Sequence, residues 1–192
     1  SLEDIFELQD QVTTSVVTAI APKITQAEME RARRKPIGSL DAYDLFLRGI
    51  ALYEQKRTFE GHTEARKLFE RAIELDPYFS TPYAMIARFL STSKLHGWPT
   101  DPEQSRVQVR QLAERVAALG NDDAHALAAT GFALAWVCQD FDAAAAFVDR
   151  AIAANPNLGI AWTNRAMVST LKGEHVQAIE QLETGFREAW LS

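Results

Sequence analysis

The stretch FDAAAAFVDRAIAANPNLGIAWTNRAMVSTLKG, residues 141–173, decides the fold. It contains two runs of helix-forming residues on either side of the turn signal Asn155-Pro156-Asn157. In the first run, the positions that precede Pro156 with successive gaps of four, three and five residues are small or apolar: Ala144, Val148 and Ala151. A helix face of small and medium side chains allows a second helix to approach closely. The stretch therefore predicts two helices packed against each other.

The same offsets recur three more times along the chain. The series are Ala65, Phe69 and Ala72 before Pro77; Val109, Ala113 and Val116 before Asn121; and Ala178, Leu182 and Gly185 before Trp190. The run before each series has a small residue at its middle: Gly49, Ala87, Gly131 and Ala166. The last two intervals between these turn marks are 35 and 34 residues. A period near 34 residues with two helices per unit is typical of an α-solenoid.

This pattern resembles the tetratricopeptide repeat over about residues 40–191. The resemblance implies an all-α solenoid of about four helix pairs, with units at about 40–77, 80–121, 124–156 and 159–191. Two connections are longer than the repeat requires, residues 56–63 and His96-Gly97-Trp98-Pro99. They are candidates for a contact particular to this chain.

Residues 1–36 precede the repeats, so the chain divides into an N-terminal segment and a repeat domain over 37–192. Apolar residues recur in the segment at helical spacing: Leu2, Ile5, Phe6, Val12, Val16, Ile20, Ile24 and Ala27. This spacing predicts an amphipathic helix, bent or broken near Pro22. We interpret the basic residues 31–35 as its charged last turn. The apolar stripe is expected to bury itself in the repeat groove or on the flank of the first repeat.

Composition excludes several classes of protein. The chain has 192 residues, a formal net charge of −6 and 47% apolar residues. An acidic balance argues against nucleic-acid binding and gives no attraction to anionic lipid, whereas the apolar content is that of a folded domain. Cys138 stands alone, so no internal disulfide forms, and no apolar run is long enough for a membrane helix. We therefore expect a cytoplasmic protein and, because the chain begins with Ser1, a fragment of a longer one.

No constellation of reactive residues is visible. The four histidines fall in four separate units without a second His or Cys at ligand spacing, so no metal site is predicted. Cys138 has no base near it in the sequence, and the nine glycines are scattered rather than gathered in a phosphate-binding loop. We expect this chain to catalyse nothing and to bind no cofactor.

A stacked array offers a concave groove lined by the first helix of each pair. The candidate protein-binding residues are Phe46, Ile50, Met85, Arg88, Phe132, Thr163, Asn164 and Met167. Arg88 and Asn164 lie two units apart, which excludes a clamp for a terminal carboxylate. The other candidates are mostly apolar, as is suitable for the apolar face of a partner helix. The alternative for any one of them is burial between neighbouring units.

The runs LEDIFELQDQV (2–12), ARRKP (32–36) and LDAYDLFLRG (40–49) resemble the C-terminal region of a bacterial family, common in rhizobia, that carries a class III adenylate/guanylate cyclase domain. The resemblance implies a regulatory interaction module in a protein that makes cyclic AMP from ATP for signal transduction. The cyclase's metal-binding and nucleotide-reading residues match nothing here. Similar tails occur on winged-helix regulators, so an effector arm of such a regulator and a free-standing adaptor remain alternatives. The expected partners are a protein or peptide, the chain's own N-terminal segment or a catalytic domain, and a second copy.

Overall fold

The computed structural model describes residues 40–120 and 122–190, and the N-terminal segment predicted over 1–36 lies outside them. The described residues form eight α-helices and one π-helical turn, with no strand among them. The elements are α2 (Leu40–Gln55), α3 (Phe59–Leu75), α4 (Ser80–His96), α5 (Pro102–Leu119), α6 (Ala124–Ala133), η1 (Leu134–Cys138), α7 (Phe141–Ala154), α8 (Gly159–Leu171) and α9 (His175–Trp190).

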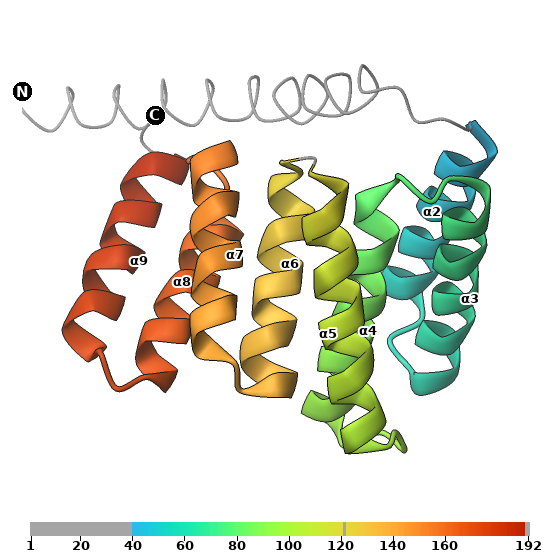
Figure 1. The fold of residues 1–192 in the computed structure, drawn as a ribbon, viewed down its shortest axis with the longest axis horizontal. Coiled ribbons are helices and arrows are strands. Elements are labelled where there is room, and N and C mark those ends of the chain that lie inside the picture. The colour runs from blue at the N-terminus through green and yellow to red at the C-terminus, as the bar shows by residue number, and fades with distance from the viewer. Residues whose placement is uncertain (1–39, 121, 191–192) are drawn as a thin grey trace, which may run out of the picture. The chain divides into compact units, whose positions relative to one another are not determined.

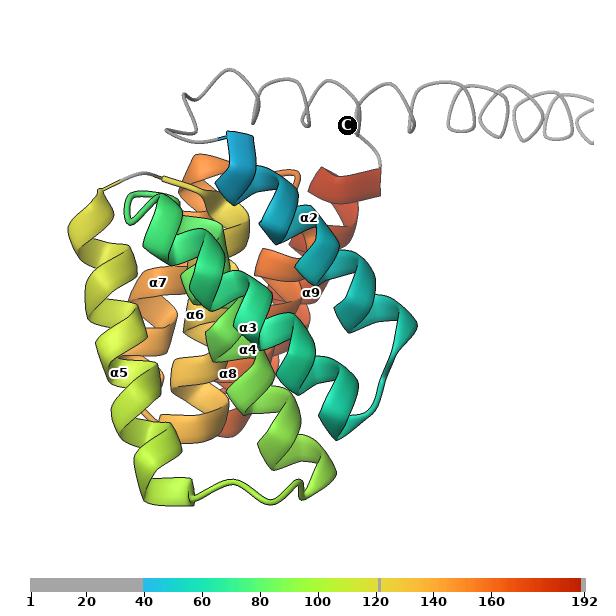
Figure 2. The same ribbon diagram turned by 90° about the vertical axis from the view of Figure 1, so that its right-hand side faces the viewer.

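The helices stand side by side as successive pairs, α2–α3, α4–α5, α6–α7 and α8–α9 (Figure 1). The second helix of each of the first three pairs also contacts the first helix of the pair that follows. The first helices α4, α6 and α8 contact one another in turn. Figure 2 shows the row from the end occupied by α2 and α3. The prediction of an all-α array of about four helix pairs is confirmed.

Short polar side chains and glycines mark many of the helix ends. The carboxylates of Asp101, Asp123 and Asp140 accept hydrogen bonds from backbone N–H groups at the starts of α5, α6 and α7. Helices α4 and α5 end at Gly97 and Gly120, each with a φ of 63°, a left-handed conformation that glycine adopts without strain. Local sequence therefore sets where these helices begin and end.

The small residues in the middle of the first helices lie where a second helix crosses. A Cβ atom on Gly49 would lie 2.5 Å from a ring carbon of Phe69, and one on Gly131 would lie 2.5 Å from a methyl carbon of Val148. The equivalent alanines of α4 and α8 are buried. Because a larger side chain would collide with the crossing helix, these positions must stay small.

The two long connections meet each other. Trp98, from the α4–α5 connection, packs its ring edge-on against Phe59 and His62 at the start of α3, with centroid distances of 5.7 and 5.0 Å. The ring of His96 stacks on Trp98 at 5.1 Å. The first two helix pairs are therefore joined by an aromatic contact, called the loop contact below, made by these four residues.

Candidate protein-binding groove

All eight candidate residues lie on the first helices of the pairs, two on each of α2 and α4, one on α6 and three on α8. The side chains of Arg88 and Thr163 are exposed, and four others are half-buried: Phe46, Ile50, Phe132 and Met167. These six positions are distributed over all four pairs. They are the part of the predicted set that a partner can reach.

Met85 and Asn164 are buried instead, with 6% and 5% of their surface exposed. Met85 belongs to the main core, and the Asn164 side-chain amide donates a hydrogen bond of 3.0 Å to the carbonyl of Ala128 on α6. Both side chains serve the packing of one helix against another. For these two residues the structure follows the alternative of burial between units.

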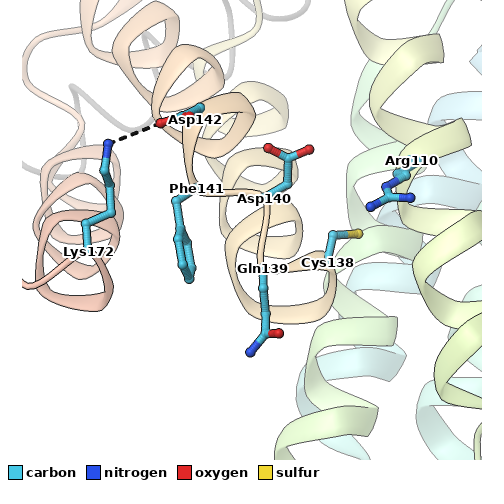
Figure 3. Close-up of a pocket in the computed structure, with 7 residues that line it drawn as sticks. All are labelled: Arg110, Cys138, Gln139, Asp140, Phe141, Asp142 and Lys172. Atoms are coloured by element: carbon cyan, nitrogen blue, oxygen red, sulfur yellow. Dashed lines mark hydrogen bonds and ion pairs between the residues drawn. The ribbon is translucent and has the colours of Figure 1, made fainter.

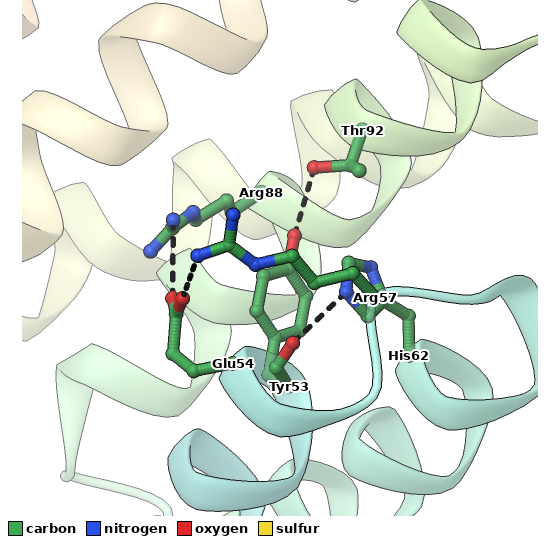
Figure 4. Close-up of polar contacts among 6 residues, drawn as sticks. All are labelled: Tyr53, Glu54, Arg57, His62, Arg88 and Thr92. Carbon is green, nitrogen blue, oxygen red and sulfur yellow. Dashed lines mark hydrogen bonds and ion pairs between the residues drawn. The ribbon is translucent and has the colours of Figure 1, made fainter.

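Arg88 lies at the centre of a polar network between α2 and α4 (Figure 4). Its guanidinium lies 3.4 Å from Glu54 and 5.1 Å from the centre of the Tyr53 ring. Arg57 also donates to Glu54, at 3.2 Å, and the Tyr53 hydroxyl lies 2.8 Å from that of Thr92. The Arg88 side chain is therefore half exposed and is oriented by Glu54 and Tyr53 beside the apolar candidates.

His62 lies beneath this network. Its ring stacks on Tyr53 at 3.7 Å, and its Nε2–H donates to the Tyr53 carbonyl at 3.0 Å. Nδ1 is buried, and the described residues offer it no hydrogen-bond partner. Burial lowers the pKa of His62, and the nearby positive charge of Arg88 acts in the same direction. The ring is therefore neutral at physiological pH and serves as a packing surface.

Trp136 extends the apolar surface of α6, and the sequence reasoning missed it. Its ring lies nearly parallel to that of Phe132, four residues earlier, at a centroid distance of 6.3 Å. The spacing of four from Phe132 was the available signal. Trp136 belongs to η1, whose backbone is held by the Asp140 N–H bond to the Leu134 carbonyl (3.2 Å). The Lys94 ammonium of α4 adds a bond of 2.7 Å to the Trp136 carbonyl.

A pocket of about 360 Å³ lies on a different part of the molecule (Figure 3). It is lined by Arg110, Cys138, Gln139, Asp140, Phe141, Asp142 and Lys172, none of which is a groove candidate. Lys172 pairs with Asp142 at 3.1 Å. Burial raises the pKa of Cys138, whose thiol lies 3.6 Å from the Arg106 carbonyl. The thiol is therefore protonated at neutral pH and is a poor nucleophile.

Within 40–120 and 122–190, no three His, Cys, Asp or Glu side chains come together as metal ligands would. None of the helices in these ranges combines the length and the apolar character needed to cross a bilayer.

The chain is similar to a curated protein and to a solved structure. No family model matches the chain. The chain is 28% identical over 136 residues, 71% of its length, to the curated protein named "Putative adenylate cyclase 3" from Rhizobium meliloti (strain 1021). The matched region is 23% of that protein, so the chain spans about a quarter of the length of the curated relative it matches. The sequence of this chain resembles a cyclase tail, and it is also similar to a region of a protein that is named as a putative adenylate cyclase.

A solved structure, the MamA RS-1 ArsTM double mutant, matches with a TM-score of 0.52 and 16% sequence identity. The match covers 95% of this chain and 93% of that one. MamA is a tetratricopeptide-repeat solenoid, and at this identity the likeness shows the fold alone. The tetratricopeptide-type α-solenoid predicted from the sequence is confirmed.

Proposed function

We propose that this chain is a non-catalytic module that binds the apolar face of a partner helix along the first helices of its repeats. The observation that carries the proposal is a row of half-buried apolar side chains contributed by three of the four helix pairs. It runs from Phe46 and Ile50 on α2, through Phe132 and Trp136, to Met167 on α8. Aromatic and Met side chains suit such a partner because they adapt their packing to an apolar surface.

Arg88 supplies polarity in the middle of this row. Its guanidinium is held by Glu54 and the Tyr53 ring and is half exposed. A fixed cation beside an apolar surface favours a partner helix with an acidic residue next to its apolar face. The proposed ligand is therefore an amphipathic helix with a carboxylate at the edge of its apolar stripe.

We place this module, residues 37–192 with the four units given above, in the regulatory tail of a bacterial class III nucleotide cyclase in the cytoplasm. Similarity to a region of a protein named as an adenylate cyclase supports this proposal. The conversion of ATP to cyclic AMP would then belong to another part of the polypeptide. The module would act by binding a partner protein or the catalytic domain.

Peptide selection tests the binding proposal. A library of helical peptides would be selected against the 192-residue chain, and the enriched peptides measured by fluorescence anisotropy. We expect apolar residues at spacings of three and four, and binding at least tenfold weaker to the Phe132→Glu and Arg88→Glu variants. Val107→Glu on α5 is the matched control, because Val107 is 53% exposed and lies outside the row. Enriched peptides that bind all variants equally would contradict the proposal.

The cyclase proposal has a separate test in the full-length polypeptide. Cyclic AMP production would be compared between the intact protein, a protein without the repeat module, and one carrying Phe132→Glu. We expect both changes to alter the rate and Val107→Glu to leave it unchanged. An unaltered rate and oligomeric state after deletion of the module would refute the regulatory role.

A further inference from the structure

The outer face of α9 carries a patch of exposed apolar side chains. Val176, Ile179, Leu182 and Phe186 are exposed by 73%, 58%, 48% and 60%. Their spacings of three and four residues place them on one face of the helix. No other described helix has more than two exposed large apolar side chains. The α9 face, defined by these four residues, is therefore the densest exposed apolar surface in the described part of the chain.

The repeat pattern shows what kind of surface this is. Leu182 lies eight residues before the last turn mark, as Phe69, Ala113 and Val148 do in the earlier units. Those three are at most 5% exposed, and the helices that carry them each contact the pair that follows. The isoleucines four residues before Pro77 and Pro156, which correspond to Phe186, also pack against the core. The α9 face is thus a junction surface, shaped to receive another helix.

Helix α2 of a second copy is a poor occupant. The positions by which α4, α6 and α8 approach the preceding pair are largely apolar and buried, as with Phe89, Ala133 and Val168. On α2 the corresponding face is mixed: it carries the exposed apolar side chains of Leu47 and Ala51 beside Asp44 and Arg48, an ion pair of 3.7 Å whose side chains are 67% and 65% exposed. The equivalent arginine of α8, Arg165, is accommodated at its junction because it pairs with Asp149 at 2.7 Å. Desolvation of the Asp44–Arg48 pair has a cost that a wholly apolar partner surface avoids, so the mixed α2 face matches the α9 face less well than a second α9 face does.

We propose that the α9 face is a homodimer interface at which α9 of one copy packs against α9 of another. Among the described surfaces, only a second α9 face matches it in apolar density. A two-fold axis brings identical patches together, so one self-complementary surface suffices. The proposal is independent of the partner-binding function, because the α9 face and the proposed groove share no residue.

The size of the face sets the strength of the dimer. Helix α9 has 16 residues and is therefore about 24 Å long. A strip of that length and about 10 Å width covers roughly 250 Å² per copy, against about 800 Å² per partner in a standard stable interface. We therefore expect a reversible dimer that dissociates on dilution.

Sedimentation velocity of the 192-residue chain from about 5 to about 500 μM tests this. We expect the mass to rise from monomer to dimer, and the Ile179→Glu variant to remain monomeric with an unchanged circular dichroism spectrum. Val107→Glu is the matched control, because Val107 on α5 is 53% exposed, close to the 58% of Ile179, and lies outside the α9 face. A monomer throughout the range, or equal loss of the dimer in both variants, would overturn the proposal.

Cross-linking tests the symmetry without relying on a destabilised variant. A short bis-maleimide should join two Leu182→Cys chains through residue 182, with every chain carrying Cys138→Ser because Cys138 lines the pocket. In a mixture of Leu182→Cys and Arg48→Cys chains, products joining residue 182 to residue 48 would show head-to-tail packing and overturn the proposal. A dimer that disappears when the chain is extended by its native C-terminal sequence would also overturn it, since the following segment would then be the occupant.

Discussion

The two outer helices of the solenoid, α2 and α9, end the array with opposite chemistry. On α2, the face that would approach a preceding pair carries the ion-paired side chains of Asp44 and Arg48. On α9, the face that would receive a following pair carries the half-exposed Leu182 and its apolar neighbours. A solenoid gains stability from the interfaces between neighbouring units, so its outermost surfaces must be polar or be covered. The α2 end carries an exposed ion pair on its outer face, whereas the apolar α9 end has to be covered.

The largest difference is expected where one repeat position is buried in one unit and exposed in another. Phe69→Ala removes a fully buried ring between α2, α3 and α4 and should lower the free energy of unfolding by about 3–5 kcal/mol. Leu182→Ala removes a half-exposed side chain at the equivalent position and should cost about 1 kcal/mol. Urea denaturation at a concentration where the chain is monomeric measures both. Equal decreases in the free energy of unfolding for the two variants would mean that Leu182 is packed as tightly as Phe69, which contradicts the prediction.

A smaller difference is expected between two arginines at equivalent places in α2 and α8. Arg165 is 15% exposed, lies 2.7 Å from Asp149 and donates to the Ser169 hydroxyl at 3.0 Å. Its replacement by Ala should cost about 1.5–3 kcal/mol, because a hydrogen-bonded, partly desolvated pair is broken. Arg48→Ala should change stability by less than about 0.5 kcal/mol, because its ion pair is exposed. If Arg48→Ala proves as costly as Arg165→Ala, the α2 face is not a solvated end surface.

The smallest effect concerns pH and the loop contact near the α2 end. The pKa of His62 is lowered by burial in the fold; the hydrogen bond to the Tyr53 carbonyl and the charge of Glu54 favour protonation, and Arg88 and His96 oppose it. In the unfolded chain the pKa is about 6.5, so the unfolded state binds the proton first as the pH falls. Stability is therefore full above about pH 6.5 and decreases below it, by up to about 1.4 kcal/mol per unit of pKa difference, until the folded state also takes up the proton.

The His62→Phe variant is the control for this prediction, since phenylalanine keeps an aromatic ring against Tyr53 and Trp98 but cannot titrate. The free energy of unfolding between pH 5 and 8 should fall less steeply for the variant than for the unmodified chain. Identical pH profiles would show that His62 is equally easy to protonate in both states.

Much of the fold could be predicted because it depends on short-range patterns. Gly49 and Gly131 must be glycines where helices cross, and the same offsets repeat in every unit. The candidate groove was harder, because accessibility depends on the neighbouring unit. Met85 and Arg88, three residues apart on α4, have opposite environments: one lies in the core and the other pairs with Glu54. Trp136 was missed although its spacing of four from Phe132 was a signal in the sequence; the π-helical turn that holds its backbone has no such marker.

The sequence by itself determined the number of helix pairs, their order and the small residues at their crossings, since these follow from periodicity and steric size along one helix. The tertiary structure decided three other properties. It brought Trp98 against His62, chose which groove positions stay accessible and left the face containing Leu182 exposed. Each of these depends on contacts between residues far apart in the chain. A helix has the same sequence pattern whether or not another helix covers it, so only the packed array shows which faces are buried.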